Sequence, residues 1–459
     1  MALAALSEIL AAARVDAPAM AAIKGEDPVL PVRYCIGTAG AASLAALGLA
    51  VEELWELRGG ARQRVDVDLR AAAASLRSAR YLRVNGKPPP APWDPLSGFY
   101  PVREGWISIH CNFRNHREAA MGVLRATTRE AGEQAARGWQ GEALEDAIHA
   151  AGGCAGFVRS HEHWARHPQA LAVATQPLID IERIGDAPPE PLPEAPRPLA
   201  GVRVLDLTRV LAGPTCARSL AEHGADVLKI SAAHLADSGA MELDTGIGKL
   251  SARLDLRKPE GVAKLQALAR DADVFSQSYR PGALARRGFA PEDLAALRPG
   301  IVCVSLSAWG GSGPWRERRG FDSIVQSVSG IAHATGGEAG DGAKPKLLPV
   351  SAIDYVSGYL MAFGATLALA RRAREGGSWL VRVALARVGK FIVDLGEPRQ
   401  PWAGLPEELP EAELAALMGE MDAPEGRIRF LKPVIQLSQT PPHWTRPPVP
   451  LGTHPPAWP

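Results

Sequence analysis

Two short apolar runs decide the fold: Val202–Leu207 reads VRVLDL, and Ala225–Ile230 reads ADVLKI. Both are rich in branched residues, and similar runs follow at Asp273–Ser276 and Ile301–Leu306. The helical patterns between these runs cover Pro214–His223 and Pro259–Arg270. Short strands that alternate with helices of about 10–15 residues predict a parallel sheet with helices on both faces. We therefore predict an α/β fold with an open parallel sheet, whose ligands lie at the carboxyl ends of the strands.

The composition is that of an ordinary globular protein. The chain has 459 residues, 46% of them hydrophobic and 22% charged, with a formal net charge of +1. This balance gives no reason to expect a nucleic acid or a membrane as the partner. No basic region followed by an apolar core opens the chain, and no uninterrupted apolar run reaches the roughly 18–20 residues of a membrane helix.

The five cysteines are dispersed and form no C-x-x-C pair. No histidine stands beside them at metal-ligand spacing, so the sequence predicts no metal site. An odd, scattered set of thiols is typical of the reducing cytoplasm, which is the expected location.

A proline-rich stretch divides the chain into two regions. Residues Gly185–Pro198 read GDAPPEPLPEAPRP, which is typical of an extended linker. The same order of features occurs on both sides of it. In the first region, Leu-Pro-Val at 30–32 is followed by an alanine-rich helical pattern, a Gly-Gly pair and the run QRVDV at 63–67. In the second region, Leu-Pro-Val at 348–350 is followed by the same features, which end with the run LVRV at 380–383. We interpret this as a partial duplication, although two unrelated alanine-rich helices followed by glycine turns remain an alternative.

The two copies differ at one position that matters. Counted from Leu-Pro-Val, Ile36 in the first copy corresponds to Asp354 in the second. Only the second copy therefore places an ionisable group at the start of its helix.

The C-terminal region contains eight motifs in a fixed order. They are PLAGVRVLDLTRVLAGP, HGADVLKI, GKLSARLDLRKPEG, SYRPGALARRGF, LSAWGGSGP, RGFDSIVQSVSG, ATGG and LPVSAIDYVSGYLMAFGATLALARR. This succession resembles the family III CoA-transferases of the CaiB/BaiF superfamily over residues 198–390. The closing segment LKPVIQLSQTPPHWTRPPVPLGTHP is similar to the family as well. In the first region, RGGARQRVDVDL and SGFYPVREGWISIH resemble later portions of the same family.

The resemblance implies an organisation and a partner. We expect a duplicated partial copy with a small domain at 1–185, a linker at 186–198, a Rossmann-like CoA-binding domain at 199–392 and a wrapping segment at 393–459. Family members are interlocked homodimers, so a homodimer is expected, unless the fusion reproduces part of that arrangement within one chain.

The resemblance also implies the chemistry, a CoA transfer from an acyl-CoA to a carboxylic acid. In the family an aspartate at the position of Asp354 attacks the thioester, which gives an aspartyl anhydride and then an aspartyl-CoA thioester. A helix N-terminus favours such a carboxylate, and covalent catalysis divides the exchange into easier steps. Coenzyme A is then a substrate, and no permanently bound cofactor is needed.

The family's CoA-contacting positions are carried over residue by residue. They fall on Arg209, Leu211, Ala212, Lys249, Ser278, Tyr279, Arg280, Arg286 and Arg319. A few basic side chains suffice for the phosphates of CoA. Some relatives have a polar residue at the position of Leu211 and a basic residue at the position of Ala232. This chain therefore has fewer polar and basic side chains available to contact CoA.

Three alternatives stay open. Asp354 could be a plain helix cap, since aspartate is favoured there. The chain could be an acyl-CoA-binding homologue without catalysis. An acyl-CoA racemase is disfavoured because its Gly-His-Asp motif is replaced by Gly320-Phe321-Asp322, and phenylalanine carries no proton. The histidines at 110, 116, 161 and 163 are interpreted as surface residues or satisfied core residues.

Overall fold

A seven-stranded sheet forms the centre of the molecule, seen here in a computed structural model. The structure describes residues 1–15, 21–90, 93–235, 239–337 and 343–459. The sheet has the order β10-β9-β8-β11-β12-β13-β7, and only β7 runs antiparallel to its neighbour. Its strands are β7 (Asp180–Gly185), β8 (Arg203–Leu207), β9 (Asp226–Ser231), β10 (Lys249–Arg253), β11 (Val274–Gln277), β12 (Val302–Ser307) and β13 (Ser378–Ala384). The predicted α/β fold with a mostly parallel sheet is confirmed.

The strand order reverses between β8 and β11. From β8 the chain moves outward to β9 and β10, and it later returns to the other side of β8 with β11, β12 and β13. The loops that follow β8 and β11 therefore diverge from neighbouring strand ends, which is where open α/β sheets bind their ligands.

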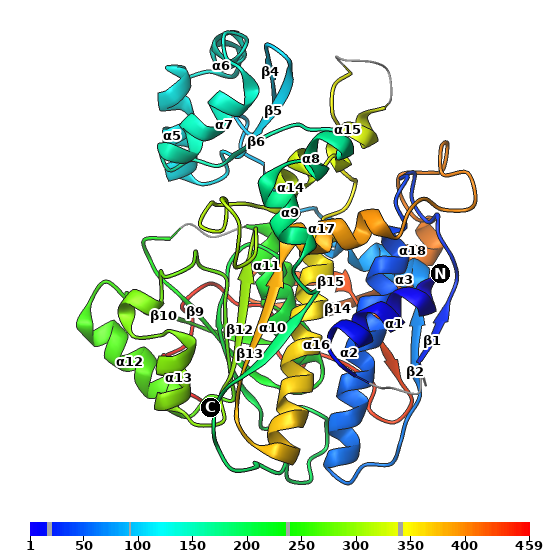
Figure 1. The fold of residues 1–459 in the computed structure, drawn as a ribbon. Coiled ribbons are helices and arrows are strands. Elements are labelled where there is room, and N and C mark those ends of the chain that lie inside the picture. The colour runs from blue at the N-terminus through cyan, green and yellow to red at the C-terminus, as the bar shows by residue number, and fades with distance from the viewer. Residues whose placement is uncertain (16–20, 91–92, 236–238, 338–342) are drawn as a thin grey trace.

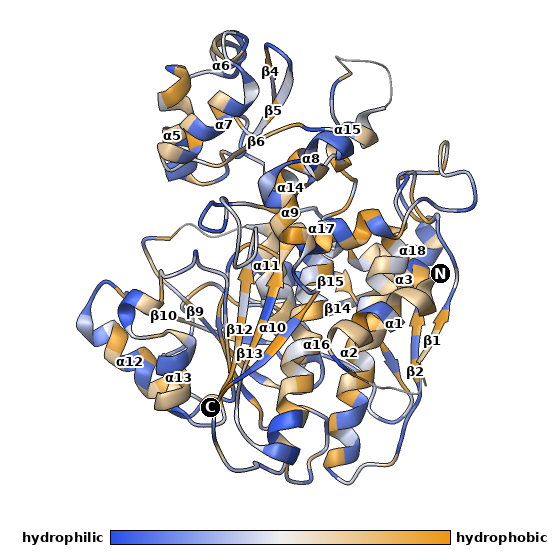
Figure 2. Cartoon of the chain, viewed as in Figure 1, coloured by the Kyte–Doolittle hydropathy of each residue, from blue (hydrophilic) through white to orange (hydrophobic). Residues whose placement is uncertain are grey.

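Helices cover both faces of this sheet because its strands are apolar on both sides. Val204, Val227 and Val274 share one core with α10 (Ala212–Glu222) and α16 (Ala352–Glu375). Leu205, Leu228 and Phe275 alternate with them and pack in a second core with α12 (Pro259–Arg270) and α13 (Pro291–Leu297). The cartoon in Figure 1 shows these layers, and Figure 2 shows apolar strands between helices of mixed polarity.

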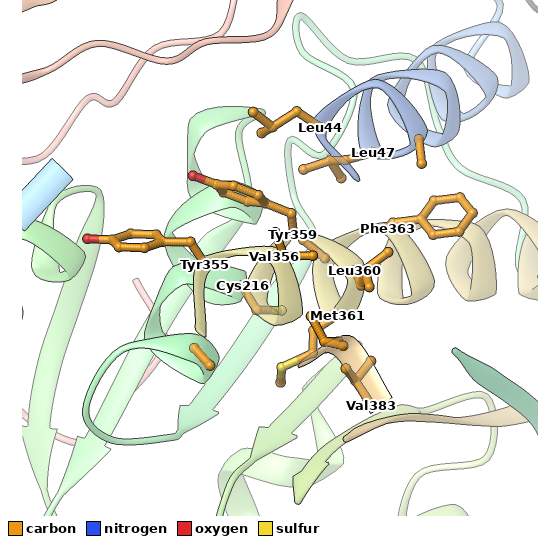
Figure 3. Packing of buried hydrophobic residues seen from close by; sticks show 14 of the residues in the cluster. Leu44, Leu47, Cys216, Tyr355, Val356, Tyr359, Leu360, Met361, Phe363 and Val383 are labelled. Carbon is orange, nitrogen blue, oxygen red and sulfur yellow. The ribbon is translucent and has the colours of Figure 1, made fainter. Parts of the chain in front are cut away.

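The two helices of the sequence repeat lie side by side. Helix α2 (Ile36–Leu57) packs along α16, and Leu44 and Leu47 face Tyr359, Leu360 and Phe363 (Figure 3). The first copy also keeps a small sheet of β1 (Ala21–Lys24), β2 (Val65–Asp68) and β16 (Gln436–Leu437) beside α2. The described part of the repeat thus forms one continuous core with the large sheet.

Helix α16 is long and apolar enough to cross a membrane by length and composition alone. However, 94% of its most apolar window is buried inside the protein. Its hydrophobic residues therefore serve the core between α2, α10 and the sheet.

A separate small layer stands at the top of Figure 1. It contains the sheet β4 (Gly98–Val102), β5 (Gly105–Ile109) and β6 (Ala155–Phe157), covered by α5 (Arg114–Leu124), α6 (Arg129–Ala136) and α7 (Gly141–Ala150). The segment SGFYPVREGWISIH forms the antiparallel pair of β4 and β5. Helix α14 (Asp322–Val328) contacts β5 and β6 and so joins this layer to the rest.

The C-terminal segment runs back over both regions. Strand β15 (Gly426–Leu431) pairs with β14 (Met418–Ala423) and with β3 (Arg83–Val84), and His454 N donates to Ser251 O beside the large sheet. The remaining elements are α1 (Ala2–Ala12), α3 (Leu69–Ser75), α4 (Ser78–Tyr81), α8 (His161–Ala165), α9 (Pro168–Ala174), α11 (Ala240–Gly246), η1 (Ala285–Arg287), α15 (Ile331–Gly336), α17 (Leu385–Asp394) and α18 (Glu411–Leu417). Since β7 precedes the linker yet joins the large sheet, the domain boundaries drawn from the sequence stay a prediction.

Candidate active site

Asp354 lies in the first turn of α16, as predicted, but it does not cap the helix. The residue at the N-cap is Ser351, whose N–H donates to Leu76 O, and Asp354 is the third residue inside the helix. Its side chain is only 8% exposed, and no described residue donates a hydrogen bond to its carboxylate. The plain helix-cap interpretation of Asp354 is therefore wrong.

The electrostatic surroundings of Asp354 are unfavourable to its charge. Burial raises the pKa of the Asp354 carboxyl well above its usual value, and the nearby carboxylate of Asp322 raises it further. Asp322 itself accepts a hydrogen bond from Asp354 N at 3.0 Å. A buried carboxylate with a perturbed pKa and no partner is a frequent mark of a catalytic group.

The N-terminus of α10 is pressed against α16 one turn after Asp354. An added Cβ at Gly358 would lie 2.5 Å from Ala212 O, so only glycine permits this approach. The contact places Leu211 and Ala212, both buried, close to the start of the Asp354 helix. Two of the residues predicted to contact CoA thus lie beside the predicted nucleophile.

Replacing Gly358 with alanine tests this contact. We expect the protein to lose about 1–3 kcal/mol of stability, because the new methyl group would overlap with the backbone oxygen of Ala212, which cannot move without shifting α10. Urea denaturation measures the loss. Gly122→Ala, in α5, is the matched control, since a Cβ added at Gly122 would meet no atom of the described residues within 4 Å. Equal behaviour of the two variants would contradict the close approach.

The loops at the reversal of strand order contact each other. Arg209 N, after β8, donates to Ser278 Oγ, after β11, at 3.3 Å. Val210 has a φ of 72°, a left-handed conformation that a β-branched residue adopts only under strain. Such strain is concentrated at functional sites. Tyr279 follows in the same loop and is turned by a hydrogen bond from its N–H to Gln277 Oε1.

Three predicted arginines converge on the small layer. Arg319, Arg209 and Arg280 come from three different loops, yet all lie close enough to His116 to lower its pKa, together with burial, to about 4. The Arg209 guanidinium also lies 5.0 Å above the ring of Phe113. This cluster of positive charge suits a phosphate or carboxylate ligand. Arg286, by contrast, lies on η1 and is exposed.

Lys249 has a structural environment. It is 2% exposed, and its Nζ donates to Asp206 Oδ2 at 2.7 Å and to Pro214 O at 2.8 Å. Because the ammonium group already has these partners, the geometry does not support the CoA contact predicted for Lys249. The ion pair instead ties β10 to β8 and to α10.

An aromatic stack beside the site has no counterpart among the sequence motifs. His110 on the turn after β5 stacks on Phe321 with ring centroids 3.8 Å apart, and Phe113 and His116 border the pair. His110 and His116 are buried, and neither Nδ1 has a hydrogen-bond partner among the described residues. The interpretation of these two histidines as surface or satisfied core residues is wrong. Only the fold brings them to Phe321, which directly precedes Asp322.

No group of histidine, cysteine, aspartate or glutamate side chains in the described residues could hold a metal ion. The five cysteines are buried and unpaired by disulfides. The arrangement therefore combines a buried carboxylate, an arginine cluster and a group of aromatic rings.

Several known proteins are similar to the part of the chain that contains the large sheet. The CoA-transferase family III profile matches residues 199–395. An acetyl-coenzyme A transferase of Hypoxylon pulicicidum is 36% identical over 44% of this chain and 35% of its own length. The succinyl-CoA:glutarate CoA-transferase of Mus musculus is 36% identical over 39% of this chain and 43% of its own. The chain thus spans less than half of the length of these relatives.

Another relative is matched over more of its length. The probable fatty acyl-CoA transferase of Mycobacterium tuberculosis is 30% identical over 54% of this chain and 68% of its own length. A crystal structure of a hypothetical protein from the same organism shares 33% identity over 42% of this chain and 56% of that chain, with a TM-score of 0.39. The chain belongs to CoA-transferase family III.

Proposed function

We propose that the protein is a CoA-transferase that moves coenzyme A from an acyl-CoA to a carboxylic acid, with Asp354 as the nucleophile. The observation that carries the proposal is the Asp354 carboxylate, buried and unpartnered among the described residues, at the start of α16. The next turn of this helix packs against Ala212, which follows β8. Membership of the family supports the class of reaction. The positive end of the helix dipole supports a carboxylate that must ionise to react.

The proposed reaction uses no group other than the substrates and Asp354. A carboxylate oxygen of Asp354 adds to the thioester carbonyl, and the carbon–sulfur bond breaks to release CoA thiolate and leave a mixed anhydride. The thiolate attacks the aspartyl carbonyl, expels the first carboxylate and forms an aspartyl-CoA thioester. The incoming carboxylate then repeats these two steps in reverse order, which yields the new acyl-CoA and free Asp354.

The arginine cluster is proposed to hold the anionic parts of CoA. Replacing Arg280 with alanine should raise the KM for the acyl-CoA about 10- to 100-fold with a smaller change in kcat, because a charge-assisted hydrogen bond contributes about 1.5–3 kcal/mol. Steady-state kinetics measures both constants. Arg316→Ala is the control, since its side chain is 60% exposed and pairs with neighbouring Glu317. A fall in kcat at unchanged KM would contradict the binding role.

A covalent adduct tests the function itself. The protein would be incubated with succinyl-CoA, acetyl-CoA and longer acyl-CoAs, trapped with hydroxylamine and digested for mass spectrometry. We expect a hydroxamate on the peptide that contains Asp354 and on no other peptide. CoA binding by calorimetry without any adduct would favour the non-catalytic acyl-CoA-binding homologue. If neither an adduct nor CoA binding is detected, the proposed function is wrong.

The names of several relatives suggest where to begin the search for substrates. Among them are transferases that take CoA from succinyl-CoA to glutarate and to D-citramalate. Succinyl-CoA with small dicarboxylates is therefore the first pair to assay.

A further inference from the structure

Asp322, which lies outside α16, accepts a hydrogen bond from an N–H group in the first turn of this helix. It is the first residue of α14, is buried, and lies 32 residues before Asp354 in the chain. Its Oδ2 accepts from Asp354 N at 3.0 Å. Burial raises the pKa of Asp322 to about 6, and hydrogen bonds from Asp354 N, Gln326 and Ile353 N oppose this rise. The N–H group of Asp354 thus has a hydrogen-bond partner outside the helix, and the Asp354 side chain does not cap α16.

Asp322 is itself held firmly. Gln326, one turn further along α14, donates its amide to Asp322 Oδ1. The Oε1 of the same Gln326 accepts from Leu348 N at 2.8 Å, in the Leu-Pro-Val segment that leads into α16. Both oxygens of Asp322 therefore have donors, whereas neither oxygen of Asp354 accepts a hydrogen bond from a described residue. The pair is unequal, and the negative charge is better accommodated on Asp322.

The neighbouring elements bring other ionisable groups, most of which have partners of their own. His110 and His116, from the small layer, are held neutral by burial, which lowers the pKa of each. Arg218 of α10 pairs with Asp244 at 2.8 Å. Arg387 of α17 donates to Gln176 O, and Arg80 from the first copy donates to Pro349 O.

The loops contribute Arg209, Arg280 and Arg319, which gather around His116. Besides burial, the charge that acts most directly on Asp354 is that of Asp322.

We propose that Asp322 is a positioning residue for the nucleophile: it caps α16 in place of Asp354, and its charge keeps the Asp354 carboxylate reactive. This inference rests on the proposed role of Asp354. While Asp354 is a free carboxylate, two negative charges share a buried site and repel each other. Once Asp354 forms an anhydride or a thioester it is neutral, and the repulsion ends. The charge on Asp322 therefore favours each covalent intermediate over the free carboxylate, and it makes Asp354 a stronger nucleophile once ionised.

The test compares Asp322→Asn with Asp322→Ala and the unchanged protein. Asparagine keeps an oxygen that can accept from Asp354 N, but it carries no charge. Single-turnover formation of the Asp354 adduct from succinyl-CoA or acetyl-CoA would be followed from pH 4 to 9. In the unchanged protein we expect the rate to rise with pH as Asp354 ionises. In Asp322→Asn the midpoint should move down by about one pH unit or more, and the rate at high pH should fall.

If Asp322 had a purely structural role, its substitution would lower the rate of adduct formation by the same factor at every pH. Loss of its charge should instead move the pH midpoint of that rate. Asp322→Ala should show the same midpoint as Asp322→Asn together with a lower melting temperature, because it also loses the cap. An unmoved midpoint in both variants would overturn the proposal.

A second measurement does not depend on catalysis. Asp354→Asn would be made in the unchanged protein and in Asp322→Asn, and the stability gained at pH 7 compared. We expect the gain to be smaller in the Asp322→Asn background, since the repulsion has already been removed. Equal gains would overturn the proposal even in an active enzyme. Unequal gains with no adduct in any variant would instead mean that the charges are coupled but that the proposed transferase function fails.

Discussion

Asp354→Asn is expected to abolish turnover, with a loss on the order of 10⁴-fold or more in kcat, as when other covalent nucleophiles are removed. Asparagine has nearly the same shape, and the carboxylate of Asp354 accepts no hydrogen bond from a described residue, so the fold should persist. Coupled assay of acyl-CoA formation measures the rate, and mass spectrometry should find no adduct. Asp186→Asn, whose side chain is fully exposed, is the control and should retain full activity. Turnover by Asp354→Asn near the normal rate would refute the proposed mechanism.

The same substitution should make the protein more stable. Folding raises the pKa of Asp354 above its usual 3.8, so ionisation of this group costs stability in the folded state. The cost is absent below about pH 4, where the group is protonated in both states, and it grows as pH rises towards the folded pKa. Asp354→Asn removes it, so we expect a gain of about 1–3 kcal/mol at pH 7 that vanishes at about pH 4. Urea denaturation at both pH values measures the gain, which should be absent for Asp186→Asn.

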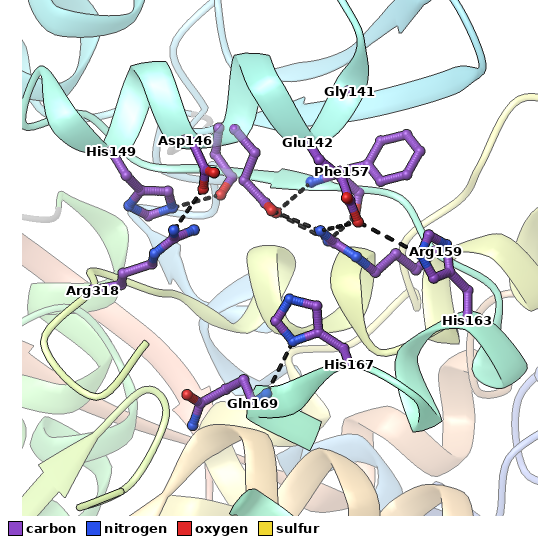
Figure 4. A network of polar contacts seen from close by, with 12 residues as sticks. Gly141, Glu142, Asp146, His149, Phe157, Arg159, His163, His167, Gln169 and Arg318 are labelled. Carbon is purple, nitrogen blue, oxygen red and sulfur yellow. Dashed lines mark hydrogen bonds and ion pairs between the residues drawn. The ribbon is translucent and has the colours of Figure 1, made fainter. Parts of the chain in front are cut away.

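Glu145→Ala is expected to cost the most stability, about 3–5 kcal/mol. Arg159 and Glu145 are 1% and 2% exposed, and Arg159 Nη2 lies 2.7 Å from Glu145 Oε2. Figure 4 shows Arg159 beside Glu142 and Phe157. Glu145 Oε1 also accepts from Phe157 N at 2.8 Å, which fixes β6 against α7. Removing the carboxylate leaves a guanidinium buried with Glu142, itself half exposed, as its remaining charged partner among the described residues. Chemical denaturation of the whole chain measures the loss.

Two controls separate the buried pair from the rest of this network. Glu142→Ala should cost less than about 1 kcal/mol, because a partly exposed ion pair contributes little. Replacing both partners, as Glu145→Leu with Arg159→Met, should recover most of the loss, since no charge is then left buried alone. If Glu145→Ala and Glu142→Ala cost the same stability, the Arg159–Glu145 pair does not hold the small layer together.

The damage should reach the active site as well. Arg159 N donates to Ser327 O, within the helix α14 that begins at Asp322. The small layer and the cap of α16 are thus connected through a single short helix. Variants at Glu145 should therefore lose activity at temperatures at which Glu142→Ala keeps it.

Local patterns in the sequence were sufficient for the central elements. The helix predicted over Pro259–Arg270 is observed with the same bounds, because a proline opens it and its apolar period is regular. The strand predicted at Ile301–Leu306 is observed at Val302–Ser307. The start of the Asp354 helix was also predictable, since an apolar helical pattern follows Leu-Pro-Val directly.

The side chains that surround Asp354 could not be predicted from local sequence patterns. Asp322 caps α16 across 32 residues, and His110 reaches Phe321 from another layer of the molecule. Lys249 was predicted to contact CoA, yet it pairs with Asp206, which lies 43 residues away in the chain on a nearby strand. Contacts of this kind depend on how strands order themselves in the sheet, which hydrophobic periodicity does not specify.

The packing of α2 along α16 has a consequence for how the protein responds to dilution. Tyr359 of α16 donates to Ser75 Oγ, and Ser78 contacts Tyr355 Oη at 3.0 Å, so the first copy braces the helix that carries Asp354. Both copies belong to one chain, and their effective concentration for each other is fixed by the covalent connection. A brace supplied by a separate subunit would be lost when protein becomes scarce. Here the specific activity contributed by this contact should stay constant down to the lowest concentration that an assay can detect.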